Sequence, residues 1–298
     1  MKRRLATLAC LAFATHAITA AAADCTATAP PTGELIGTGL LDPNTPEPER
    51  QRLAQLLTCT ALAGNANSMD VAGSLYRWGP RHPAHLFPED HDKARDLFTA
   101  AASQGRRGAM IKLAELELAD GHAREAMVWY QIENAYYIRS NGTPGAGDAQ
   151  KGSGYYTMLL KRITDALGPF DEQALIRDVN GRMAALDKQM AANPPRPSSG
   201  PGLGKARMPA RARLGVTTKA EKDDGAFAQY FVEVGPDGSI TRRWLIDAYP
   251  DPASGMRLAR ALDQTHFDPL PAGGKDMRYA LLPVSLRSIH NGVQMQQP

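Results

Sequence analysis

The chain has 298 residues, of which 43% are hydrophobic and 22% are charged, and its formal net charge is +3 at pH 7. This balance lacks the excess of Lys and Arg that nucleic-acid-binding surfaces carry, so we expect no nucleic-acid partner. The length allows about two domains.

The N-terminus has the order of a secretory signal. Three basic residues at positions 2–4 precede an apolar stretch at 5–14, and four alanines follow at 20–23. This order predicts export with cleavage after Ala23, and therefore a periplasmic location. Cleavage would remove the apolar stretch, so we expect no stable membrane insertion afterwards. An uncleaved inner-membrane anchor is the alternative, although Thr and His residues interrupt the stretch and would weaken its hold in a bilayer.

Cysteine usage agrees with export. Removal of the signal leaves Cys25 and Cys59, and two thiols in an oxidising compartment predict one disulfide. The bridge would tie the new N-terminus to a helix expected at residues 51–62 and contribute about 3 to 4 kcal/mol through loop entropy. Two free buried thiols are the alternative.

Composition divides the mature chain into two parts. Residues 193–209 are rich in Pro, Gly and Ser and contain almost no large apolar side chain, which predicts a linker. We therefore expect one domain at residues 24–192, a linker at 193–210 and a second domain at 211–298.

Apolar residues in the first domain recur at helical spacing. These residues form four sets, and each set would place one apolar stripe on one helix face. The spacing of the first two sets returns in the third and fourth, which predicts repeated helix pairs. Glycines at positions 79, 105 and 121 are expected to end helices, and residues 49–62, 154–167 and 171–193 to form helices that cap the array. The four sets are Ala72, Leu75 and Tyr76; Ala94, Leu97 and Phe98; Leu113 and Ala114; and Ala126, Trp129 and Tyr130.

Two segments carry a family resemblance. Residues 72–79, AGSLYRWG, and 92–105, DKARDLFTAAASQG, resemble the Sel-one-like repeat, a relative of the tetratricopeptide repeat, and residues 111–135 form a less similar second copy. The resemblance implies a short, curved α-solenoid whose concave face holds peptides or partner proteins. Aromatic residues are candidates for that face, although at helical spacing such residues more often belong to a core. They are Tyr76, Trp78, Trp129, Tyr130, Tyr136 and Tyr137.

Beyond the linker the period of the pattern changes to two. Residues 230–234 and 240–244 read as strands, with the turn signal Gly-Pro-Asp-Gly between them at 235–238. Helical spacing follows at 251–264, and a last strand is expected at 278–286. The order β-β-α-β predicts a small α+β domain. We therefore expect the fold class of the whole chain to be α plus α+β, that is, a helical domain followed by a small α+β domain.

This second domain resembles the C-terminal domain of TonB-type proteins. The matching segments are VEVGPDGSI at 232–240, FDP at 267–269 and LLPVSL at 281–286. The resemblance implies that an exposed edge of the sheet pairs with an extended peptide. An energy-transducing component anchored in the inner membrane is the alternative role.

The candidate edge is the last strand, at residues 279–286. Its candidate binding residues are Tyr279, Leu281 and Pro283. An ordinary strand whose edge is covered by a loop is the alternative, because proteins protect exposed strand edges.

Histidines in the loop at residues 81–92 are the best candidates for metal ligands. His82, His85 and His91 stand there among acidic residues, and these residue types bind zinc or copper. Prolines interrupt the loop and no cysteine accompanies it, so an insertion between two helices is the interpretation that we favour.

No pattern in the sequence defines a catalytic constellation. The glycine-rich segment at 142–154 lacks the Gly-Lys-Ser/Thr of a phosphate-binding loop, which favours a connection between helices. We therefore expect a non-catalytic scaffold of the cell envelope, with protein or peptide partners and no cofactor. A metal-binding or otherwise cryptic enzyme is the alternative.

Overall fold

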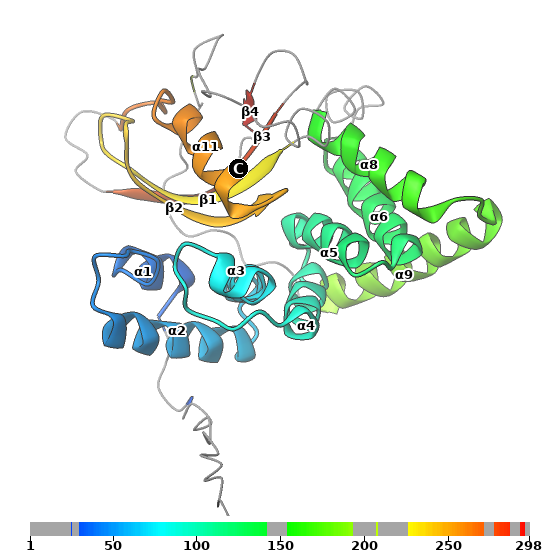
Figure 1. The fold of residues 1–298 in the computed structure, drawn as a ribbon, viewed down its shortest axis with the longest axis horizontal. Helices are drawn as coiled ribbons and strands as arrows, with labels where there is room; N and C mark the ends of the chain where they lie inside the picture. Colours follow the sequence, from blue (N-terminus) through cyan, green and yellow to red (C-terminus); the bar gives the residue numbers. More distant parts are fainter. Residues whose placement is uncertain are drawn as a thin grey trace, which may run out of the picture.

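The structure is a computed structural model that describes residues 25, 30–141, 154–192, 207, 226–270, 277–286 and 293–295. It is a mixed fold, in which a series of helices is followed by a small antiparallel sheet (Figure 1). The predicted signal, the glycine-rich segment at 142–153 and the predicted linker, except for Arg207, lie outside these residues. In the described ranges, no helix has both the length and the apolar character required to cross a membrane.

The elements follow the predicted order closely. The helices are α1 (Thr32–Gly37), α2 (Glu47–Leu62), α3 (Ala66–Trp78), α4 (His91–Ala102), α5 (Arg107–Ala119), α6 (Ala123–Asn141), α8 (Gly154–Leu167), α9 (Glu172–Ala192) and α11 (Pro252–Leu262), with a 3-10 turn at Gly79–Arg81. The strands are β1 (Phe227–Val234), β2 (Ile240–Tyr249), β3 (Arg278–Leu286) and β4 (Val293–Met295).

Local chemistry explains where several helices begin and end. Asn65 and Asp90 cap α3 and α4, because each side chain accepts a hydrogen bond from a backbone N–H in the first turn. Gly79 follows α3 with φ of +48°, and a Cβ at this position would lie 2.3 Å from the backbone nitrogen of Glu89. A side chain is therefore excluded there, and the predicted helix end at Gly79 is confirmed.

Small residues let neighbouring helices approach closely. Ala94 and Ala101 of α4 are fully buried, and a Cβ added to Gly73 of α3 would lie 2.7 Å from the Phe98 ring. Helices α3 and α4 pack on each other, as do α5 and α6, whereas α9 packs on α6 and not mainly on its chain neighbour α8. Helices α3 and α4 are therefore closely spaced.

The sheet has the order β2-β1-β3-β4, with antiparallel pairing throughout. Every residue of β1 is buried, because α11 covers one face of the sheet and the helices before the predicted linker cover the other (Figure 1). On the second face Phe231 and Trp244 share a core with Leu35 of α1 and Val71 of α3. The two predicted domains therefore pack together through a common interior.

Three features were not part of the prediction. Helix α1 lies in the segment between the two cysteines, and its Leu35 and Ile36 are fully buried. Strand β4 adds to the expected β-β-α-β order and pairs with Val284–Leu286 of β3. The third feature is the extensive contact between the sheet and the helices.

The predicted disulfide is present in the structure. The Sγ atoms of Cys25 and Cys59 lie 2.07 Å apart, with 5.2 Å between the Cα atoms. The bond ties residue 25 to the last turns of α2, as the sequence led us to expect.

Candidate functional site

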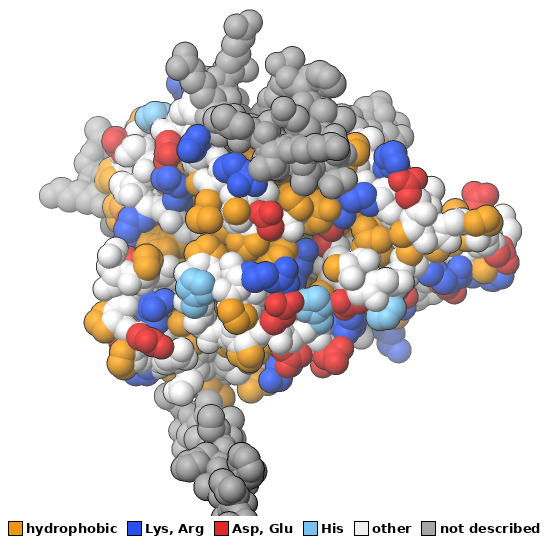
Figure 2. All heavy atoms as spheres, viewed as in Figure 1, with side chains coloured by type: hydrophobic (Ala, Val, Ile, Leu, Met, Phe, Trp, Pro, Cys, Tyr) orange, Lys and Arg blue, Asp and Glu red, His pale blue; other side chains and the backbone are white. Residues whose placement is uncertain are grey.

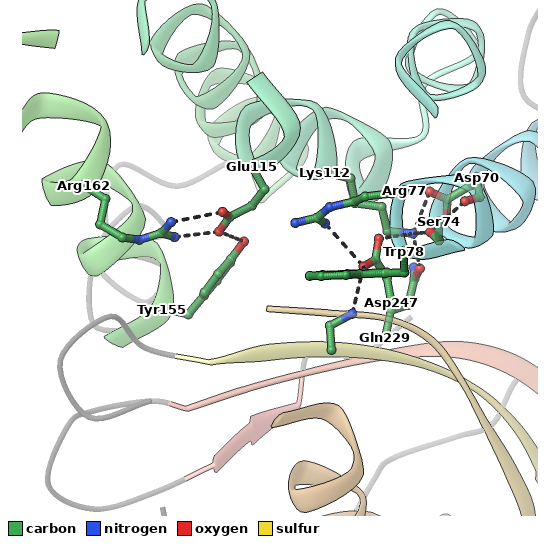
Figure 3. Close-up of polar contacts among 11 residues, drawn as sticks. Asp70, Ser74, Arg77, Trp78, Lys112, Glu115, Tyr155, Arg162, Gln229 and Asp247 are labelled. Carbon is green, nitrogen blue, oxygen red and sulfur yellow. Dashed lines mark hydrogen bonds and ion pairs between the residues drawn. The ribbon is translucent and has the colours of Figure 1, made fainter. Parts of the chain in front are cut away.

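A buried ammonium group lies where the helices meet the sheet. Lys112 of α5 is 1% exposed, and its Nζ donates to Asp70 Oδ1 at 2.9 Å, Ser74 Oγ at 2.8 Å and Gln229 Oε1 at 2.6 Å (Figure 3). An ammonium group has three hydrogens, so all its donors are used. Two of the acceptors belong to α3 and the third to β1, so Lys112 joins three elements.

Asp247 of β2 is the second centre of this cluster. Its Oδ1 accepts hydrogen bonds from Trp78 Nε1 at 2.6 Å, from Arg77 Nη1 at 3.3 Å and from the backbone nitrogen of Ala248 at 2.8 Å. Its Oδ2 lies 3.8 Å from Lys112 Nζ. Two buried carboxylates, Asp70 and Asp247, thus share one buried lysine, with an arginine beside each.

Helix and sheet periodicity bring these residues together. On α3 the contributing side chains at positions 74, 77 and 78 follow Asp70 by four, seven and eight residues, which places all four on one helix face. Gln229 and Asp247 are direct partners in the register of β1 and β2, so both reach Lys112 of α5. We call this set the interface network; its members are Asp70, Ser74, Arg77, Trp78, Lys112, Gln229 and Asp247.

A second polar cluster joins α5 to α8. Glu115 lies one turn after Lys112, and its carboxylate accepts hydrogen bonds from Arg162 at 2.7 and 3.1 Å and from the Tyr155 hydroxyl at 2.9 Å (Figure 3). Burial raises the pKa of Tyr155 well above its usual value, so the hydroxyl stays protonated and donates. Arg162 also lies 3.9 Å from the centre of the Tyr249 ring.

A pocket of about 230 Å³ opens between the two clusters. It is formed by the C-terminal ends of α3 and α5, the start of α4, α8 and the end of β2. Figure 2 shows basic and acidic side chains side by side where the helices meet the sheet, with hydrophobic side chains next to them. We call it the junction pocket; its lining residues are Arg77, Trp78, Arg81, His91, Glu115, Leu118, Ala119, Arg162, Tyr249 and Pro250.

The sequence singled out only two of these residues, Trp78 and His91. The other polar residues of the pocket and of the interface network were not predicted. Lys112 nevertheless carries a signal in the sequence, since it stands between Ile111 and Leu113 in an apolar stretch of a helix. Gln229 and Asp247 likewise interrupt apolar strands. A charged or amide side chain at such a position is buried only when a partner satisfies it, which is a recognisable but non-specific hint.

The three candidate histidines have different surroundings. His82 is 2% exposed; its Nδ1 accepts from the backbone nitrogen of Ala84, and its Nε2 lies 3.2 Å from the carbonyl oxygen of Leu245. Burial lowers the pKa of His82 to about 4, so the ring is neutral near pH 7. His85 is exposed, while His91 Nδ1 lies 2.6 Å from Asp120 Oδ1.

No metal-binding group is evident in the described part of the chain. There, no three or more His, Cys, Asp and Glu side chains are arranged so that they could hold a metal ion. His82 instead hydrogen-bonds across the interface between the helices and β2.

The candidate aromatic residues serve several different contacts. Trp78 belongs to the interface network, Trp129 and Tyr136 are buried in the helical core, and Tyr136 donates to Asp187 Oδ1 at 2.8 Å. The other three are half-buried: the Tyr76 ring packs on Phe87, the Tyr130 hydroxyl donates to the backbone of Tyr156, and the Tyr137 ring lies under Arg107.

The candidate strand edge is only partly paired. Strand β4 covers the outer edge of β3 at Val284–Leu286, whereas from Tyr279 to Pro283 no described strand pairs with that edge. Tyr279 is 46% exposed; its ring stacks on Phe231 at 5.7 Å and its hydroxyl donates to Glu233 Oε2 at 3.0 Å. Leu281 and Pro283 are half-buried.

Comparison of the chain with models of known protein families, with characterised proteins and with solved structures finds no match.

Proposed function

We propose that the chain is a non-catalytic periplasmic scaffold that binds an extended peptide of a partner protein by strand addition at β3. In this proposal, a short array of Sel-one-like helix pairs carries a TonB C-terminal-like sheet. The observation that supports it best is the outer edge of β3 from Tyr279 to Pro283, which has no partner among the described strands. Peptides that pair with such an edge gain affinity from backbone hydrogen bonds.

The helices that would form the peptide groove of a repeat array pack on the sheet. Helices α1, α3 and α8 contact the strands, and Lys112 of α5 hydrogen-bonds to β1. A peptide partner would have to displace the sheet from these helices. The edge of the sheet is therefore the better candidate surface.

Of the two outer edges, that of β2 is the better protected. Two register shifts in its pairing with β1 distort the strand, and Arg242 and Arg243 place charges along it. Bulges and charged residues are the usual means by which proteins block pairing at an edge. His82 also reaches the carbonyl oxygen of Leu245. Strand addition is accordingly assigned to β3.

Export to an oxidising compartment fits the bond between Cys25 and Cys59. Disulfides persist outside the cytosol and are rare within it. The signal-like order of residues 1–23 supports the same location.

A proline variant tests the proposal directly. Proline is tolerated in a strand where its missing N–H faces away from a neighbour, so Pro283 indicates that alternate residues, including Leu281, direct their N–H to the outer edge. Leu281→Pro would remove that donor, while Leu281→Ala would shorten the same side chain and keep the donor. Peptides selected from a displayed dodecapeptide library on the full chain would serve as ligands.

We expect the selected peptides to bind Leu281→Ala with nearly the affinity of the unaltered chain. With Leu281→Pro the affinity should fall about tenfold, which corresponds to the loss of one backbone hydrogen bond. Circular dichroism would verify that both variants fold. Equal binding by Leu281→Pro and Leu281→Ala would contradict strand addition at β3.

A further inference from the structure

We propose that the junction pocket binds a carboxylate group, supplied either by a small organic acid or by the C-terminus of a peptide. This site is separate from the β3 edge and does not depend on strand addition. It rests on the arginines and aromatic rings that line the pocket.

Three guanidinium groups from three parts of the chain meet in the pocket. Arg77 and Arg81 lie 4.8 and 4.9 Å from the centre of the Trp78 ring, and Arg162 lies 3.9 Å from that of Tyr249. Stacking on an aromatic face holds a guanidinium plane in place and leaves its N–H groups at the edge free to bind. Such pre-arranged planar donors match the two oxygens of a carboxylate.

Two of these arginines have donors that the described residues do not satisfy. Arg77 makes a single hydrogen bond, which at 3.3 Å is long, so its Nε and Nη2 have no partner in the described part of the chain. The Nε of Arg162 is buried and likewise lacks a hydrogen-bond acceptor there. The unpaired nitrogens of Arg77 are not fully buried, so a carboxylate in the pocket can reach them and supply acceptors, whereas the buried Arg162 Nε is out of its reach.

The charge of the pocket favours a monoanion. Three arginines line it against one acidic residue, Glu115. Each arginine is also paired with a carboxylate, namely Asp247 for Arg77, Glu89 for Arg81 and Glu115 for Arg162. The remaining positive potential is therefore small, which suits a singly charged planar carboxylate better than a phosphate dianion.

Size and polarity limit the rest of the ligand. A volume of about 230 Å³ is below the range of roughly 300–1,000 Å³ that is typical of sites for drug-sized ligands. Trp78, Leu118, Tyr249 and Pro250 give the pocket apolar sides. The fitting ligands are thus small aromatic or aliphatic acids, or the last residue of a peptide with an apolar side chain.

A variant that fills the pocket without removing a charge provides the test. Ala119 lines the pocket at the end of α5 and is exposed, so Ala119→Phe should fold and obstruct the site. Ala185→Phe introduces the same ring on α9 at a position that is also exposed and lies outside the pocket. Benzoate would be titrated into the full chain and followed by the indole N–H signals in proton–nitrogen NMR spectra.

We expect saturable binding of benzoate with a Kd of about 1 mM, as suits a ligand of this size. Ala119→Phe should weaken it at least tenfold, and Ala185→Phe should leave it unchanged. Benzamide, which has the same shape without the charge, should not bind, and inorganic phosphate should bind more weakly than benzoate. Leu281→Pro, which tests the β3 edge, should bind benzoate normally.

The source of the carboxylate follows from a second pair of probes. The peptide Ala-Ala-Phe would be compared with its C-terminally amidated form and with benzoate. If the free-acid peptide binds more tightly than benzoate, the site is assigned to peptide ends. If it binds more weakly than benzoate, the site is assigned to small acids. Either result supports carboxylate recognition. Absence of saturable benzoate binding, equal binding of benzamide, or an equal loss in both phenylalanine variants would overturn it.

Discussion

Replacing Lys112 with methionine would test whether the interface network stabilises the fold. Methionine has a similar length and a comparable helix propensity, so Lys112→Met removes the charge with little change of shape. The substitution deletes hydrogen bonds to Asp70, Ser74 and Gln229. It leaves two buried carboxylates, those of Asp70 and Asp247, without the ammonium group between them.

The expected cost follows from burial. Lys112 and its two acidic neighbours are each about 1% exposed or less, and breaking a buried ion pair by removing one partner costs about 3 to 5 kcal/mol. Lys161→Met is the matched control, since Lys161 is 61% exposed and pairs with Asp165 on the surface of α8. Its loss should cost no more than about 0.5 kcal/mol.

Urea unfolding followed by circular dichroism would measure both variants. Adding Asp70→Asn to Lys112→Met should restore more than about 1 kcal/mol, because it removes the buried charge that has lost its hydrogen bond from Lys112. The network would have no stabilising role if Lys112→Met cost less than about 1 kcal/mol. A double variant no more stable than Lys112→Met would show that the loss does not arise from buried charge.

Two further predictions concern pH and the disulfide. The pKa of His82 is about 4 in the folded chain and about 6.5 when unfolded, so protonation favours unfolding. The contribution of His82 to stability should be constant above about pH 7.5 and fall by about 2 kcal/mol by pH 5. His82→Gln should show a smaller decrease in urea midpoints over that window, and an equal decrease would refute the assignment. Cys25→Ser should lower the free energy of unfolding by about 3 to 4 kcal/mol, since 34 positions separate the bonded cysteines, and an unchanged value in urea would contradict this.

Local patterns predicted most of the secondary structure. The expected helix at 154–167 and strand at 278–286 coincide with α8 and β3, and the helix expected at 251–264 is α11. Gly238, in the predicted turn between β1 and β2, has φ of +88°. These elements could be predicted because their apolar spacing, caps and turn residues lie within one short segment.

The docking of the sheet on the helices depends on distant pairs. Lys112 and Gln229 are separated by 117 positions, and Arg77 and Asp247 by 170. In sequence each is a polar residue within an apolar element, and nothing local identifies its partner. Helix α1 and strand β4 are too short for a periodic signal, and α1 is held by burial of Leu35 and Ile36.

The polar character of the interface has a consequence for the junction pocket. The free energy of an apolar contact, such as that between Phe231 and the helices, depends little on small shifts of the sheet. The hydrogen bonds to Lys112 and Asp247, in contrast, require one orientation of the sheet relative to the helices. The same orientation places Arg77 of α3 opposite Tyr249 of β2 in the lining of the pocket. Because the pocket is built from both the helices and the sheet, the network that fixes their docking also fixes its shape. The backbone donors of the β3 edge, in contrast, all belong to one strand. The two proposed binding surfaces should therefore respond differently when the network is disturbed.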